Sequence, residues 1–200
     1  NNDIYNILYT LRNKNDFEYN EVKCKHLFLC IPPEYTLDWN IIKMNLLPLV
    51  YSVDTIPLHH IYGYSKNLKK FNNNSFYINT NSEIAQIISG DFDNNWFQVS
   101  YSSGDNAEYW NRIKLQKPNL FKKLIRKSLK DNKIDIDFTK LESHYWDKAI
   151  HYWKPNNNFN INKCVKNSIY PHPINLPNCY WCGEAFSSIQ GWIEGSLETS

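Results

Sequence analysis

Short apolar runs separated by polar residues dominate the start of the chain. Residues 4–10 and 26–31 are mostly apolar, and the polar segment 13–16 lies between them. The second run stops at Pro32 and Pro33, and proline cannot continue a hydrogen-bonded ladder. The pattern therefore predicts two β-strands joined by a turn.

The middle of the chain carries a clearer β pattern. Apolar and polar residues alternate over 55–64, 75–80, 84–89 and 96–101, and asparagine-rich turns and a Gly-Asp pair separate these segments. Such alternation is typical of half-buried strands. We expect the four segments to be antiparallel neighbours in one sheet.

Two helices are predicted next. Asp105 is a candidate N-cap for a helix over 106–113, because its carboxylate can accept from first-turn amides. Pro118 suits the start of a second helix over 119–130. One side of this helix should carry Leu120, Leu124 and Ile125, and the rest is basic: Lys122, Lys123, Arg126 and Lys127. We interpret the basic residues as a solvated face and keep a nucleic-acid patch as the less favoured alternative.

The C-terminal third is less regular. A strand or loop is expected over 135–153, a connector rich in proline and asparagine over 155–177, and a short strand over 178–185. After Ser187 or Ser188, helical spacing of apolar residues predicts a helix that carries Ile189, Trp192, Ile193 and Leu197. Gly183, Gly191 and Gly195 indicate close backbone approach, either to a ligand at the helix N-terminus or to the sheet.

Composition narrows the class of protein. The 200 residues are 42% hydrophobic and 16% aromatic, enough for one core or two smaller cores that share an interface. A net charge of +2 from 22 basic and 20 acidic residues does not fit a dedicated nucleic-acid binder. No apolar run of about 18 residues and no signal peptide is visible, so neither a membrane nor secretion is expected. We expect a cytoplasmic or virion location.

The start of the chain and its asparagine runs suggest its origin. The sequence begins without Met, which indicates a piece of a longer polypeptide. The runs at 72–74 and 156–158 are what AT-rich coding produces, so a viral protein from a large DNA virus, or a protist protein, is expected.

Five cysteines, without a secretory signal, indicate a reducing compartment rather than a disulfide framework. Cys179 and Cys182, with Cys164 and His172 upstream, are an alternative zinc ligand set. Residues three apart in a strand point to opposite faces, so we expect no metal there. A thioredoxin-like role is disfavoured because the Cys pair should directly precede a helix.

Three segments resemble the flavin-containing (FAD-dependent) amine oxidases. Residues 183–187, Gly-Glu-Ala-Phe-Ser, and 190–199, Gln-Gly-Trp-Ile-Glu-Gly-Ser-Leu-Glu-Thr, are similar to the C-terminal signature of that family. Residues 24–33 resemble its strand that ends in an aliphatic-Pro-Pro turn, and 56–64 resemble its first substrate-domain strand. The order and rough spacing match the C-terminal half of such an oxidase.

The resemblance implies a mixed α+β and α/β fold. Residues 1–46 and 165–200 would be pieces of an FAD-binding domain, and 47–164 a substrate domain with a mixed β-sheet flanked by helices. Completed by the missing N-terminal FAD-binding half, the protein would oxidise a small amine by hydride transfer to flavin, with oxygen as acceptor. FAD would be non-covalent, and a homo-oligomer or virion assembly is possible in such a protein.

The resemblance also assigns site residues. Gly183, Glu184, Gly191, Trp192 and Ile193 match cofactor-binding positions of the family, and Pro32 lies in its Pro-Pro turn. Trp192 would form one aromatic wall of the substrate cage, opposite Tyr152 or Trp153. His59, or its neighbour His60, stands where many members carry a lysine that contacts the flavin N5 through water.

Four residues that alternate near residue 150 allow two interpretations. His144, Trp146, His151 and Trp153 alternate along a presumed strand, so they either line a substrate cleft or are ordinary half-buried strand residues.

The Gly-x-Gly-x-x-Gly fingerprint is absent from a chain with only six glycines, so this chain alone should not hold FAD properly. The alternative is a non-catalytic, amine-oxidase-like structural or virion protein.

Overall fold

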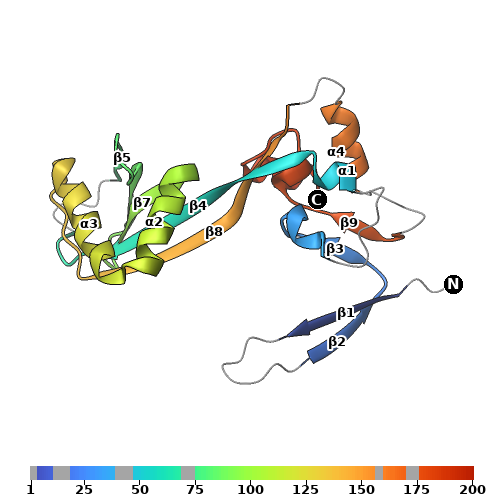
Figure 1. The fold of residues 1–200 in the computed structure, drawn as a ribbon, viewed down its shortest axis with the longest axis horizontal. Helices are drawn as coiled ribbons and strands as arrows, with labels where there is room; N and C mark the ends of the chain where they lie inside the picture. The colour runs from blue at the N-terminus through green and yellow to red at the C-terminus, as the bar shows by residue number, and fades with distance from the viewer. Residues whose placement is uncertain (1–3, 11–18, 39–46, 69–74, 156–159, 170–175) are drawn as a thin grey trace. The chain divides into compact units, whose positions relative to one another are not determined.

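The computed structural model describes residues 4–10, 19–38, 47–68, 75–155, 160–169 and 176–200. The chain forms two compact units (Figure 1). Unit 1 contains Asn1–Asp54 and His151–Ser200, and unit 2 contains Thr55–Ile150. Both predicted domain boundaries, after residue 46 and after residue 164, fall within unit 1. The assignment of an FAD-binding and a substrate domain stays a prediction.

Unit 2 is built on a five-stranded sheet with the order β5-β6-β7-β4-β8. The strands are β4 (Val53–Tyr64), β5 (Tyr77–Asn79), β6 (Gln86–Asp91), β7 (Trp96–Ser103) and β8 (Lys140–Trp153). β4 pairs antiparallel with β7, and β6 pairs antiparallel with both β5 and β7. The four predicted strands and their antiparallel arrangement are therefore confirmed.

Two helices cover one face of this sheet (Figure 1). Helix α2 is Gly104–Gln116 and helix α3 is Pro118–Asp131, with Pro118 in the first turn as predicted. The N-cap prediction for Asp105 is wrong. Gly104 has φ of +57° and begins the helix directly after β7, so Ser103 is the N-cap and Asp105 lies in the first turn.

The core of unit 2 lies between the sheet and α3. Phe121, Ile125 and Leu129 point inward at i, i+4 and i+8, while Leu120 is 36% exposed. Of the predicted apolar side, Ile125 is in the core and Leu124 packs against it, as expected, whereas Leu120 is not part of it, because the stripe that faces the sheet follows the i, i+4 row of Phe121. Burial of this row holds α3 on the sheet.

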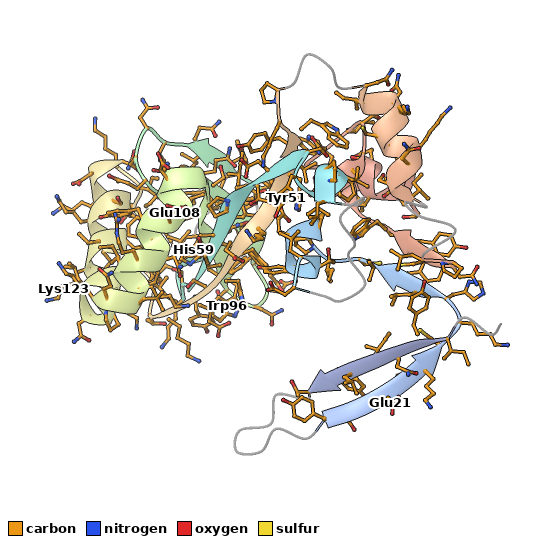
Figure 2. All side chains as sticks on the ribbon, turned by 45° about the vertical axis from the view of Figure 1, so that its right-hand side comes forward. Glu21, Tyr51, His59, Trp96, Glu108 and Lys123 are labelled. Atoms are coloured by element: carbon orange, nitrogen blue, oxygen red, sulfur yellow. The ribbon has the colours of Figure 1, made fainter. Side chains whose placement is uncertain are left out.

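Unit 1 holds two small sheets. Strand β1 (Tyr5–Thr10) pairs antiparallel with β2 (Tyr19–Cys24), and β3 (Leu27–Leu29) pairs in parallel with β9 (Cys179–Trp181). The two predicted strands over 4–10 and 26–31 are present as β1 and β3, but they are not consecutive, because the polar strand β2, on which Glu21 lies (Figure 2), comes between them and pairs with β1. The predicted turn at 13–16 lies outside the described residues.

The helices of unit 1 are short. They are η1 (Pro33–Thr36), α1 (Leu47–Val50), α4 (Ile161–Ile169), η3 (Glu184–Phe186) and α5 (Ile193–Glu198). Helix α4 lies inside the segment predicted as a connector, so that prediction is wrong over 161–169; residues 156–159 and 170–175 lie outside the described residues. Among the helices that the structure describes, none has the length and apolar character needed to cross a membrane.

The C-terminal segment differs from its prediction in detail. Strand β9 ends at Trp181, because Gly183 adopts φ of +130° and η3 follows. The last helix begins at Ile193 rather than after Ser187 or Ser188. Apolar residues at helical spacing therefore do not share one helix: Ile189 precedes α5 and Trp192 is its N-cap.

Gly195 supports tight packing of α5 rather than close approach to a ligand. A Cβ at this position would collide with the carbonyl oxygen of Ile189 and with Oγ of Ser187. We expect Gly195→Ala to lower the free energy of unfolding by about 1–3 kcal/mol, because a backbone atom cannot move aside as a flexible side chain can. Urea unfolding of Gly195→Ala and of Ser196→Ala in the same helix checks this. Equal stability of the two variants would contradict the packing role.

Candidate functional site

The parallel pairing of β3 with β9 brings together the two end segments that carry the resemblance. Leu27 pairs with Cys179 and Leu29 with Trp181, so the segments that follow the strands start side by side. The Cys182 N–H donates to the Leu29 carbonyl at 3.1 Å and extends the ladder by one step. The Pro32-Pro33 turn and the Gly183-Glu184 turn therefore both begin at the carboxyl end of this sheet.

A buried histidine joins these two turns. His151 of β8 is 4% exposed, and its Nδ1 lies 2.5 Å from Oε1 of Glu184. Its Nε2 lies 3.3 Å from Oε2 of Glu34, the residue after Pro33. One imidazole thus contacts carboxylates from η1 and from η3, which are distant in the sequence.

The carboxylates determine the charge of His151. Burial lowers the pKa of this imidazole, but the hydrogen bonds that it donates to Glu184 and Glu34 and the negative charges of both carboxylates outweigh burial and raise the pKa to about 9. At neutral pH the ring is an imidazolium, so both of its nitrogens donate. The arrangement is a buried cation held between two carboxylates.

Glu184 extends this network to the loop before the last helix. Its Oε2 accepts the Gly191 N–H at 2.7 Å, and Gly191 has φ of +80°, a conformation that favours glycine. The Thr199 hydroxyl accepts from the Gly183 N–H at 2.9 Å and donates to the Gly183 carbonyl at 2.8 Å. The structure thus brings together Gly183, Glu184 and Gly191, three of the residues predicted to bind the cofactor. Their role toward a cofactor stays a prediction.

The aromatic residues predicted for a substrate cage differ in exposure. Trp192 is 69% exposed and Tyr152 is 41% exposed. Trp153 is partly buried: its indole N–H donates to the Ser187 carbonyl at 2.9 Å, and its ring lies 6.0 Å from that of Phe186. Trp153 therefore packs within unit 1, whereas Trp192 and Tyr152 leave aromatic surface open. Their roles stay predictions.

His59 belongs to unit 2 and points into its core. It is fully buried on β4 near α2 (Figure 2), and its ring meets Tyr145 edge-on at 5.6 Å. Burial lowers its pKa to about 4, against a smaller raising effect of the Ala107 backbone, so the ring is neutral at pH 7. A residue in this position is not presented to a ligand.

His60 lies on the opposite face of the sheet, among aromatic rings. Its Nδ1 is 3.1 Å from the Tyr62 hydroxyl, and its ring centroid is 4.6 Å from Tyr101 and 5.1 Å from Trp146. Burial and the nearby His144 lower the pKa of His60, which favours the neutral ring. Of the two histidines that the sequence offered for the lysine position, His60 is the one on a partly open face.

Sequence reasoning missed Glu34 and found only part of the role of His151. Glu34 follows two prolines without a pattern that distinguishes it from an ordinary turn residue. His151 was a candidate for a cleft or for a half-buried strand face, and it is instead a buried partner of two carboxylates. One chemical argument could have found this role from the sequence: a histidine at a buried strand position requires a hydrogen-bond partner.

The structure brings no metal ligands together in the part of the chain that it describes. Among the described residues, no group of three or more His, Cys, Asp or Glu side chains is arranged so that it could hold a metal ion. Cys179 is buried in β9, and Cys182 follows the strand. His172, the fourth member of the alternative zinc set, lies outside the described residues.

Comparison with known proteins supports the fold. No family model and no curated protein matches the sequence. Among solved structures, cyclohexylamine oxidase from Brevibacterium oxydans IH-35A is similar, with a TM-score of 0.58 and 11% identity over 90% of this chain. The chain spans 42% of the length of that oxidase. At this identity the likeness shows the fold, so the predicted α+β architecture with a multi-strand sheet flanked by helices is confirmed.

Proposed function

We propose that this chain is the C-terminal part of a FAD-dependent, amine-oxidase-like oxidoreductase. It would oxidise an amine by hydride transfer to flavin, with oxygen as the final acceptor. The observation that carries the proposal is the parallel β3–β9 pair, which places the Pro-Pro turn beside the Gly-Glu turn in a fold similar to that of cyclohexylamine oxidase. Fold likeness alone would not suffice.

The residues of the C-terminal segment suit one end of FAD. A Cβ on Gly183 would meet no atom within 4 Å, so the space on that side of the residue is open, while its N–H and carbonyl are held by Thr199. Trp192 and Ile193 are 69% and 70% exposed, and the Gly191 amide is held by Glu184. FAD, when bound, supplies the hydride acceptor; these residues would position it through backbone groups, with non-covalent attachment.

The exposed aromatic residues are the ones that would contact the substrate. Trp192 would orient the amine, and Tyr152 would offer the opposite wall, because Trp153 is already engaged with Phe186 and Ser187. The histidine that stands at the lysine position, His59 or His60, stays a prediction; within unit 2, His59 is buried and His60 is partly exposed. Aromatic faces also suit an ammonium group, through cation–π attraction.

The proposed protein needs a further FAD-binding half. A two-stranded parallel sheet is a fragment by the usual rule that parallel sheets have several strands with both faces covered. Exposed apolar side chains accompany it in unit 1: Phe28, Ile189, Trp192, Ile193 and Leu197. The partner half would cover such surface and would supply the Gly-x-Gly-x-x-Gly fingerprint that these 200 residues lack.

One observation favours a second candidate function. A lysine is replaced by histidine at the position expected to contact flavin N5, and one of the two candidate histidines is wholly buried. This departure favours a non-catalytic relative, kept as a structural or interaction protein. The two candidates differ in whether the protein carries flavin that an amine can reduce.

We predict that the full-length protein that contains this chain purifies yellow and that denaturation releases its FAD, since no covalent attachment is expected. Adding amines without oxygen should bleach the flavin absorbance. The measurement is an absorbance spectrum of the native protein and of its denatured supernatant, followed by anaerobic titration with amines. A colourless protein that cannot be reconstituted with FAD would refute the oxidase and favour the structural relative.

A further inference from the structure

Four of the five cysteines lie on or next to the paired strands of unit 1. Cys24 ends β2, Cys179 begins β9, and Cys30 and Cys182 directly follow β3 and β9. Because Leu29 pairs with Trp181, the next step of the parallel register sets Cys30 beside Cys182. All five thiols are free in the structure.

The backbone holds Cys30 and Cys182 at the spacing of neighbouring strands. The Cys182 N–H donates to the Leu29 carbonyl at 3.1 Å, so the ladder continues to this position. Neighbouring strands are about 4.8 Å apart, and a disulfide needs a Cα separation of roughly 4.4–6.8 Å. In-register residues of parallel strands project to the same face. Burial, and the neighbouring Cys30, raise the pKa of Cys182.

Accessibility distinguishes Cys30 from the other four cysteines, and the register distinguishes Cys182 as the cysteine beside it. Cys30 is exposed and Cys182 is partly buried, so a small oxidant can reach the first and the second lies against it. Cys179 is 1% exposed, and burial, with the neighbouring Cys24, raises its pKa to about 11. Thiolate is the reactive form, so Cys179 is a poor nucleophile.

We propose that Cys30 and Cys182 form a reversible disulfide when a hydroperoxide reaches Cys30. The Cys30 thiolate attacks one peroxide oxygen, the O–O bond breaks, and Cys30 is oxidised to a sulfenic acid as hydrogen peroxide is reduced to water. The Cys182 sulfur then attacks the Cys30 sulfur; an S–S bond forms, the S–O bond breaks, and the hydroxyl leaves as water with the Cys182 proton. Two thiols and one hydrogen peroxide give one disulfide and two waters, and a dithiol reverses the reaction.

The bond would fasten the two turns of the candidate site. Cys30 precedes the Pro32-Pro33 turn with Glu34, and Cys182 precedes Gly183 and Glu184. A covalent link between residues so far apart in the sequence closes a long loop and restricts the unfolded chain. Oxidation should therefore stabilise the arrangement of Glu34, His151 and Glu184 rather than disrupt it.

The experiment compares thiol occupancy before and after peroxide. The full-length protein, with and without hydrogen peroxide, is alkylated and digested without reductant, and its peptides are mapped by mass spectrometry. We expect a peptide that links Cys30 to Cys182, absent after dithiothreitol, and a rise of the unfolding midpoint on the order of 10 °C. Flavin plays no part in this readout, so a colourless protein tests the proposal equally well.

Variants of single cysteines give matched controls. Cys164→Ser should leave the linked peptide unchanged, because Cys164 lies on α4 and is not a member of the paired strands or of the residues that directly follow them. Cys182→Ser should leave Cys30 as a sulfenic acid that dimedone traps, and Cys30→Ser should leave Cys182 open to alkylation. Folded, peroxide-treated protein in which both thiols are still alkylated would overturn the proposal. So would a Cys24–Cys179 bond, or a bond between two chains, as the main product.

Discussion

Replacing His151 by Phe should lower the free energy of unfolding by about 3–5 kcal/mol near neutral pH. His151 is 4% exposed, and the side chains of Glu34 and Glu184 are each 17% exposed. Removing the cation leaves two poorly solvated carboxylates close together without the positive charge that offsets them, and loss of one member of a buried ion pair is strongly destabilising. Urea unfolding of the full-length protein at pH 7 measures the loss.

The same histidine should make stability depend on pH. Its pKa rises from 6.5 in the unfolded chain to about 9 in the folded chain, so the folded state binds the proton more tightly. The resulting stabilisation, about 3 kcal/mol, is fully present below pH 6.5 and is lost as pH rises through about 9. His151→Phe should remove this decline between pH 6.5 and 9.

Two comparisons separate the effect of losing the Glu34–His151–Glu184 network from the effect of losing an aromatic ring. His144→Phe makes the same replacement at an exposed histidine of β8 and should change stability by less than about 0.5 kcal/mol. A double-mutant cycle of His151→Phe with Glu184→Gln should show non-additive losses, because the two side chains share a hydrogen bond. Additive losses, or an unchanged pH profile, would mean that His151 acts only by packing.

Local sequence patterns predicted the elements whose partners are near in the chain. Alternation identified β4 to β7, and Pro118 identified the start of α3, because each signal depends on a few neighbouring residues. Strand β2 was missed because Tyr19–Cys24 is mostly polar and exposed, so it carries no alternation of a buried face. Helix α4 was missed because asparagine-rich flanks resemble a loop.

The candidate site depends on contacts that no local pattern encodes. The parallel partner of β3 is β9, at the other end of the chain, and three-residue strands have too few positions to show a period. Glu34, His151 and Glu184 come from three separate segments that meet only after folding. Sequence resemblance identified Glu184, but it gave no reason to expect a cation beside it.

The spacing of apolar residues also did not predict that Trp192 is exposed. Its spacing with Ile189, Ile193 and Leu197 suggested one face of a helix, and such a face is normally buried. All four side chains are instead 50% exposed or more. Apolar periodicity in this segment therefore does not mark a face that is buried among the described residues.

Replacing Trp192 by Ala should slow reduction of bound flavin by an amine by about a hundredfold. Trp192 precedes α5, two residues after Gln190, whose side chain accepts the Trp153 N–H at 2.8 Å. An amine that loses this aromatic wall would be misplaced relative to the flavin, and a misplacement of about 1 Å can cost that factor in rate. FAD content should be unchanged, because the cofactor contacts expected here are mainly through the backbone.

The exposure of Trp192 makes the result decisive. A side chain that is 69% exposed contributes little to packing, so Trp192→Ala should change the free energy of unfolding by about 0.5 kcal/mol or less. Leu197→Ala removes an equally exposed apolar side chain from α5, the helix that follows Trp192, and should leave flavin reduction unchanged. Trp153→Ala should behave in the opposite way, with a large loss of stability, because its ring packs on Phe186 and its indole is hydrogen-bonded. Stopped-flow flavin reduction, flavin content and unfolding midpoints of the three variants distinguish these outcomes. If Trp192→Ala reduces flavin at the normal rate, or if it unfolds as Trp153→Ala does, Trp192 does not orient the substrate.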